Sequence, residues 1–387
     1  MNRRRPDQPV GRVAVAAVAV AVAVPVVAVL GRALRIDGAW SLDALERILS
    51  NGRTWRLVAV TVAQAIVSTA STAAIGVPLA SVLARFRFPG RSAVRTAAMV
   101  PFVLPSVVLG SAIASILGPR GLVDLRATWW PVLVAHVCFN LAVFVRVVGA
   151  ALDGLDPAIE DVARTLGATP WKAARRVMLP AVAPAIGAAA VVVFLFCLTS
   201  FGVIVILGGG SVSTLEVEIW VRATRQFDLS GAAVLAGIQV LAVVATLALH
   251  ARFARRSVRA RRGGRRWARR PDSVGEWTQV LAAVVAVGAV TVVPIAALVE
   301  RSLRLSDGTH GLDHWRHLGA ASAGTGLTVS PWDAVRVSIL SALAATAIAG
   351  LVGVPAARLV ARRPGGAADR VMLVPLGVSA TTIGLGL

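Results

Sequence analysis

Tyrosine is absent from this sequence, and lysine occurs only once, as Lys172. A phosphate-binding loop of the GxxxxGK(S/T) type needs a lysine that follows a glycine, whereas Lys172 follows Trp171, so the chain carries no ATP-hydrolysing loop of that kind. The sequence also contains no HExxH motif and no acidic pair at catalytic spacing within an apolar run. These absences argue against a membrane enzyme such as a protease or a glycosyl transferase, and we predict no catalytic residue.

Cysteine is scarce as well. The two cysteines, Cys138 and Cys197, both lie within apolar runs. The pair offers neither a disulfide framework nor the spacing of a metal site, so we expect both to be packing residues. Aspartate, histidine and tyrosine form no cluster that could hold ferric iron tightly. The sequence therefore predicts neither a metal site nor a cofactor site in this chain.

Hydrophobic residues, in contrast, make up 57% of the 387 residues, and the mean hydropathy is +0.76. Apolar runs of about 20 residues, the length that crosses a bilayer core, recur along the chain. The sequence therefore predicts an all-α fold, a polytopic transmembrane helical bundle in the cell membrane. A net charge of +21 would suggest nucleic acid in a soluble chain, but here the arginines gather in alternate loops and set topology, so we expect no nucleic-acid partner.

Nine membrane-spanning helices are expected. The basic residues before the first span place the N-terminus in the cytoplasm, and the loop 85–95, with four arginines and no acid, is also cytoplasmic. Pro101 and Pro105 predict that the third span is broken. The expected spans are residues 13–30, 57–83, 96–117, a fourth that begins at Trp129, 185–207, 231–249, 280–298, 334–359 and 371–387.

Residues 161–180 form the most informative loop, a cationic segment between two apolar runs. Asp156 and Pro157 predict the start of a short helix that runs to about Leu166. Gly167 supplies a left-handed stop, and Thr169 with Pro170 opens a second short helix. Leu179 and Pro180 are expected to end that helix where the next apolar run begins. The sequence therefore predicts two short helices joined rigidly at Gly167, and this segment is called the elbow below.

The residues Asp161-Val162-Ala163, Gly167 and Val177-Met178-Leu179-Pro180 resemble the EAA loop of binding-protein-dependent ABC importer permeases. The spacing matches that family, while Asp161 and Val162 replace the usual Glu and Ala. The resemblance implies that the elbow is a coupling helix seated in a groove of a separate ATPase subunit; the other interpretation is an ordinary capped basic loop. The residues to which it assigns ATPase coupling are Asp161, Ala163, Gly167, Ala168, Trp171, Leu179 and Pro180.

Three further segments, residues 135–140, 195–210 and 214–220, resemble the fused two-half permeases that import iron(III) or thiamine. The resemblance implies an extracytoplasmic substrate-binding protein and a pair of ABC ATPase subunits that bind the ATP; a polyamine or another small solute is an alternative substrate. The stretch that carries Glu216 and Glu218 is expected to lie outside, where a binding protein could touch it.

His136 and Asn140 lie four residues apart within the fourth span, and therefore on one helical face. Polar residues inside a membrane can line a substrate path. They can also form hydrogen bonds between helices of the bundle. Both interpretations stay open, and bundle packing is the favoured one.

An internal repeat divides the chain. Residues 55–85 match residues 332–362 without a gap, and Gly76-Val77-Pro78 falls on Gly353-Val354-Pro355. We therefore expect tandem six-span halves. The first permease half is at 1–249, with the coupling loop at 151–180. An arginine-rich cytoplasmic linker at 250–277 faces anionic membrane lipid, and a partial second half with about three spans is at 278–387. The second half is expected to be incomplete, as in a truncated chain.

A secondary active transporter is the main rival from another class, since it too is built from repeated halves. Such a transporter favours carboxylates within the membrane for ion coupling. Here aspartate and glutamate are expected only in loops or at span ends, and the elbow has no role in that mechanism.

Overall fold

The computed structural model describes residues 7–36, 39–119, 121–126, 128–156, 158–210, 212–259, 268–305, 307–316, 318, 330–362, 366–376 and 378–386. Only the backbone is described for residues 7, 8, 36, 159–161, 170, 171, 254–259, 370, 373, 376 and 380.

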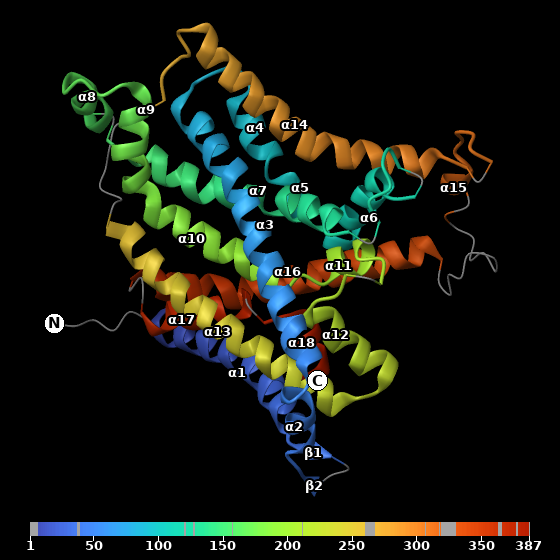
Figure 1. The fold of residues 1–387 in the computed structure, drawn as a ribbon. Coiled ribbons are helices and arrows are strands. Elements are labelled where there is room, and N and C mark those ends of the chain that lie inside the picture. The colour runs from blue at the N-terminus through green and yellow to red at the C-terminus, as the bar shows by residue number, and fades with distance from the viewer. Residues whose placement is uncertain are drawn as a thin grey trace, which may run out of the picture. The chain divides into compact units, whose positions relative to one another are not determined.

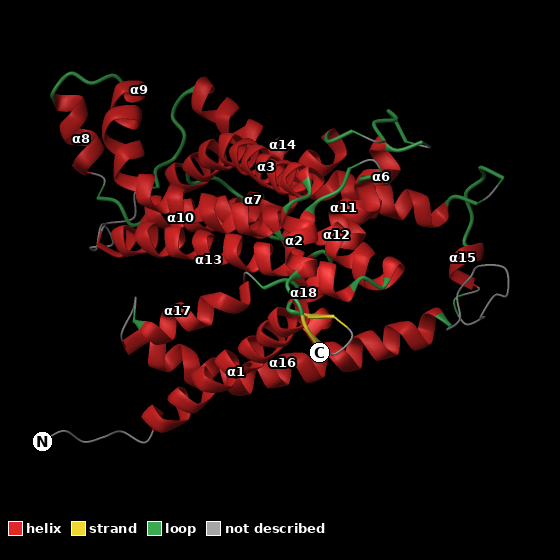
Figure 2. Cartoon of the chain, turned by 60° about the horizontal axis from the view of Figure 1, so that its bottom comes forward, coloured by secondary structure: helices red, strands yellow, loops and turns green. Residues whose placement is uncertain are grey.

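Seven of the helices in these ranges are long and apolar enough to cross a membrane, and a bent pair of helices adds an eighth candidate. Helices make up most of the described chain (Figure 2). The seven are α1 (Asp7–Ala33), α3 (Gly52–Arg85), α7 (Trp130–Asp153), α10 (Leu179–Leu198) with the turn before it, α13 (Leu229–Arg259), α14 (Val274–Leu303) and α16 (Pro331–Arg362). The polytopic all-α fold predicted from hydropathy is confirmed.

Short elements connect the long helices. They are β1 (Arg35–Ile36), β2 (Ala39–Trp40), α2 (Asp43–Leu49), α4 (Arg91–Ala97), α5 (Val100–Val103), α6 (Ser106–Leu117), α8 (Ala158–Thr165), α9 (Pro170–Ala173), α11 (Gly202–Leu207), α12 (Leu215–Val221), α15 (Asp313–Arg316), α17 (Ala367–Leu373) and α18 (Ala380–Gly386). Two π turns (Ala174–Met178 and Arg222–Gln226) and a 3-10 turn (Val374–Leu376) complete the order.

The third span is broken, as its prolines predict. The segments Arg91–Val103 and Ser106–Leu117 meet at an angle of 98°. The break falls at Leu104 and Pro105, because a proline has no N–H to donate and its ring excludes a helical conformation at the residue before it.

Two expected spans differ from the structure. The fifth ends at Leu198 rather than at Leu207, and α11 is a separate short helix that packs against α6. Gly202 permits this approach, because a Cβ at that position would lie 2.5 Å from Ser106 Oγ. The ninth is not one helix: the chain passes from α17 through the 3-10 turn at Val374–Leu376 to α18, with Pro375 in the turn.

The chain divides into two units. One contains residues 1–23 and 296–375, in which the first part of α1 packs closely on α16 and a Cβ at Gly11 would lie 2.9 Å from the Pro355 carbonyl oxygen. The other contains residues 24–295 and 376–387 and holds the buried core. The proposed division into permease halves and linker at 1–249, 250–277 and 278–387 stays a prediction.

The core of the larger unit is built on α3, α7 and α10. The helix α3 packs along α7, while α10 contacts both of them and α13 (Figure 1). Gly76 on α3 allows this close approach, since a Cβ there would lie only 2.6 Å from the Cβ of Phe144 on α7. Helices in membranes approach through such small residues because packing, not water, drives their association.

Candidate coupling loop and polar interior

The first helix of the elbow is α8, which follows α7 along the chain and projects at the upper left of Figure 1, next to α9. Its first turn is capped by Asp156, whose Oδ1 accepts a hydrogen bond of 3.0 Å from the Ala158 N–H. At its C-terminus Gly167 has φ 83°, its N–H donates to Arg164 O, and the Ala168 N–H donates to Ala163 O at 3.0 Å. These two bonds define a Schellman motif. The start, the left-handed glycine and the end of this helix agree with the prediction.

The second helix starts as predicted but does not end where expected. Thr169 Oγ1 accepts from the Lys172 N–H at 3.3 Å, which caps α9. The chain then makes a π turn at Ala174–Met178, in which the Leu179 N–H donates to Ala174 O, and continues into α10. The expectation that Leu179 and Pro180 end the helix is therefore wrong. The wider turn accommodates Pro180, whose ring would clash with the carbonyl four residues earlier in an α-helix.

The elbow leaves an apolar pair exposed. Val162 is 57% exposed and Leu166 is 82% exposed, and the two are joined by a hydrogen bond from the Leu166 N–H to Val162 O. Residues four apart share one helical face. Together with the exposed cations of the elbow they form a surface suited to docking. In the sequence the signal was an apolar residue at each of positions 162 and 166, four residues apart, whereas the resemblance to the EAA loop drew notice only to the replacement at Val162.

The residues predicted to act in coupling are placed around this surface. Gly167, Leu179 and Pro180 are exposed, and Ala163 and Ala168 are half-buried. Asp161 lies in α8 and Trp171 in α9, but their side chains fall outside the described part of the structure. The assignment of these seven residues to ATPase coupling stays a prediction.

A cluster of charged residues, called the clamp below, joins α7, the helix that leads into the elbow, to two other helices. Arg95 makes two hydrogen bonds of 2.9 and 3.1 Å to the carboxylate of Asp153, and Arg91 lies 3.4 Å from the same carboxylate. Both arginines also donate to the Leu83 carbonyl at the end of α3. The clamp therefore joins α3, α4 and α7. Its acid, Asp153, lies three residues before Asp156, which caps α8. The clamp was not predicted from the sequence, although Asp153 is an acid at the end of an apolar run and residues 85–95 carry four arginines.

We expect Asp153→Asn to weaken communication between the elbow and the broken span. The substitution removes a carboxylate that fixes two arginines, and because the pairs are partly exposed the cost in unfolding free energy should be only about 1 kcal/mol. Transport should fall several-fold while the protein level stays normal. Asp124→Asn is the matched control, since Asp124 pairs with Arg126 at 2.8 Å in an exposed loop. Equal transport in both variants would contradict this role.

The last residues of the predicted linker are anchored on the same end of α3. The Arg87 N–H donates to Arg269 O at 2.7 Å, and the Arg269 N–H donates to Arg85 O at 3.0 Å. The Arg269 side chain pairs with Asp272 and Glu276. Residues 260–267 of the linker lie outside the described ranges.

His136 and Asn140 lie inside the bundle. His136 is 2% exposed, with its Nδ1 at 2.9 Å from Ser68 Oγ on α3 and its Nε2 at 3.0 Å from Ser200 Oγ after α10. Asn140 Nδ2 donates to His136 O and to the Cys197 sulfur. The histidine therefore joins three segments, as the bundle-packing interpretation expects. A path-lining role for either residue stays a prediction.

We expect His136→Ala to be mild in transport and measurable in stability. Two interhelical hydrogen bonds would be lost, each contributing about 0.6 kcal/mol in membrane helices. The variant should unfold at a lower temperature in detergent, while uptake per molecule stays close to that of the parent. A large loss of uptake without a shift in unfolding temperature would instead support a path-lining role.

Glu216 is not at the surface. It is 1% exposed on α12, where Gln239 Nε2 of α13 donates to its Oε2. Burial raises the pKa of this carboxyl, an effect that hydrogen bonds from Thr381, Gln239 and Ser379 partly oppose. The side chain is buried because α12 packs on α13 and α18, so Glu216 itself is not free to touch a binding protein, while the expected position of this stretch outside the membrane stays a prediction. Glu218 is half-buried and pairs with Arg222 at 2.9 Å.

Known proteins resemble the segment that contains this site. The family model described as "Binding-protein-dependent transport system inner membrane component" matches residues 76–259. The sulfate transport system permease protein CysT of Escherichia coli (strain K12) is 30% identical over 203 residues, which is 49% of this chain and 73% of that protein. The thiamine transport system permease protein ThiP of Salmonella typhimurium is 31% identical over 216 residues, 52% of this chain and 39% of that protein.

Two further relatives extend the comparison. A probable molybdenum ABC transporter permease protein of Haloferax volcanii is 34% identical over 184 residues, 46% of this chain and 66% of that protein. Among solved structures, a bacterial ABC transporter involved in the import of the acidic polysaccharide alginate is similar with a TM-score of 0.49 and 20% identity, over 59% of this chain and 87% of that one.

Proposed function

This chain belongs to the family of binding-protein-dependent transport system inner membrane components, and we propose that its elbow is the site at which a pair of ABC ATPase subunits drives it. The chain is a multi-pass membrane permease component of an ABC importer. ATP hydrolysis belongs to the partner in this proposal, consistent with the lack of a GxxxxGK(S/T) loop in the sequence.

The exposed pair Val162 and Leu166 is the observation that carries this assignment. Two exposed apolar side chains four residues apart share one helical face and offer a contact surface to a partner. The Schellman motif at Gly167 fixes the angle between α8 and α9, so a movement of the docked partner would be transmitted into α10 through continuous helix. The clamp at Asp153 provides a second connection, to α3 and to the broken span.

The arginine-rich connection between α3 and α4 favours a cytoplasmic location for the elbow. A cytoplasmic N-terminus follows from the basic residues that precede the first span. In this orientation an extracytoplasmic binding protein would deliver substrate at the opposite end of the bundle.

A small solute is the proposed cargo. Thiamine, named for ThiP, is one candidate, and sulfate and molybdenum, named for the other two permeases, are further candidates, because the three permeases are 30–34% identical to this chain. The relatives described above give no specific support to iron(III). The binding protein, rather than the polar groups inside the bundle, would set the choice among them.

Reconstitution tests the function. The chain, the ATPase subunit and a binding protein are placed in proteoliposomes, and ATP hydrolysis is measured with and without loaded binding protein. We expect hydrolysis to rise when the loaded binding protein is added. A secondary transporter would show uptake driven by an ion gradient without the ATPase, and that result would overturn the proposal.

A further inference from the structure

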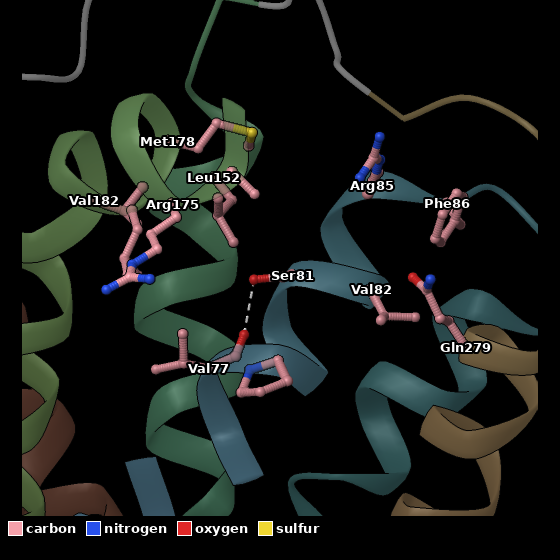
Figure 3. Close-up of a pocket in the computed structure, with 13 residues that line it drawn as sticks. Val77, Ser81, Val82, Arg85, Phe86, Leu152, Arg175, Met178, Val182 and Gln279 are labelled. Atoms are coloured by element: carbon pink, nitrogen blue, oxygen red, sulfur yellow. Dashed lines mark hydrogen bonds between the residues drawn. The ribbon is translucent and has the colours of Figure 1, made fainter. Parts of the chain in front are cut away.

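A cavity of about 710 Å³ lies beside the π turn of the elbow. It is lined by the last turns of α3, the end of α7, the π turn, the start of α10 and Gln279 of α14. Figure 3 shows Arg85 and Phe86 on one side of this cavity and Arg175, Met178 and Val182 on the other. Its volume is within the range of small-ligand pockets, about 300–1,000 Å³.

The walls are apolar where they belong to the spans. Val77, Val82, Leu152 and Val182 line the cavity from α3, α7 and α10. The hydroxyl of Ser81 donates to Val77 O at 2.8 Å and so offers no free donor. An apolar wall at the end of membrane-spanning helices suits a hydrocarbon chain.

The charge on the walls has one sign. Arg85 and Arg175 line the cavity, and no acidic residue is among the described residues that line it. Arg175 is exposed, and within the described ranges it makes no ion pair with an acid. An arginine fork binds phosphate oxygens strongly. Apolar walls with basic groups therefore match an anionic phospholipid.

We propose that this cavity binds one anionic phospholipid, with an acyl chain against Val77, Val82 and Val182 and the phosphate at Arg175. The bound lipid would lie against the π turn that joins the elbow to α10. Lipid composition would then influence the coupling element directly, in addition to any docked partner.

Native mass spectrometry of the intact chain in detergent tests this site. The probes are phosphatidylglycerol, phosphatidylcholine with the same acyl chains, and inorganic phosphate. We expect one retained phosphatidylglycerol per chain, weaker retention of phosphatidylcholine, and no competition by inorganic phosphate. Competition by inorganic phosphate would show a simple anion site and overturn the proposal.

Two variants separate this site from general attraction to basic surfaces. Arg175→Gln should weaken phosphatidylglycerol binding about tenfold, as expected for loss of a charge-assisted contact. Arg176→Gln, the adjacent exposed arginine that does not line the cavity, should change it less than about twofold. Val82→Phe fills the cavity at unchanged charge and should also reduce binding. Equal effects of both arginine variants, or no effect of Val82→Phe, would overturn the proposal.

Discussion

Gly167→Val is expected to abolish ATP-driven transport while the protein stays folded in the membrane. Gly167 has φ 83°, a conformation that costs an L-residue about 1–2 kcal/mol, and more when the side chain is branched at Cβ. The strain would break the two bonds of the Schellman motif and change the angle between α8 and α9. A Cβ at this position meets no atom within 4 Å, so the effect arises from backbone conformation and not from a clash.

The measurement is the ATPase activity and uptake of reconstituted vesicles. We expect hydrolysis to lose its stimulation by loaded binding protein and uptake to fall to background, with a normal amount of folded permease. Gly308→Val is the matched control. Gly308 likewise has a positive φ, 86°, and a Cβ there would meet no atom within 4 Å, but it lies outside the elbow. Transport at the parental rate in Gly167→Val would show that the elbow does not couple.

Gly76→Ala should cause a large loss of stability for a conservative change in the core. The added Cβ would lie 2.6 Å from Phe144 Cβ and 3.0 Å from its Cγ, closer than carbon atoms pack. The helices α3 and α7 would have to separate along their shared interface. Overpacking of this kind costs about 1–3 kcal/mol.

Thermal unfolding in detergent measures this effect, with Gly149→Ala as the control. Gly149 is a buried glycine within α7 whose added Cβ would meet no atom within 4 Å. Its replacement should be neutral or stabilising, since alanine favours a helix by up to about 1 kcal/mol over glycine. Equal unfolding temperatures for the two variants would contradict the close approach of α3 and α7.

Local features of the elbow could be predicted from the sequence because each depends on atoms a few residues apart. The Asp156 cap, the Gly167 conformation and the Thr169 cap all involve bonds between residues no more than five positions apart. The long helices were predictable for a similar reason, since apolar length alone decides whether a helix can span.

Contacts between distant segments could not be predicted in this way. The clamp joins Arg95 to Asp153, and His136 bridges Ser68 and Ser200. Neither pairing follows from spacing, because each depends on which helices pack together and at what rotation. The burial of Glu216 has the same cause, because it depends on α12 packing on α13, which an amphipathic stretch after a glycine turn does not reveal.

Hydropathy and capping residues were enough to predict a helical membrane protein with a capped elbow between two spans, because both act locally. The way in which α3, α7 and α10 meet, the partners of Asp153 and Glu216, and the continuation of the elbow through a π turn into α10 became visible only in the folded chain. The physical reason is that close packing selects among helix arrangements that are all compatible with the same local signals.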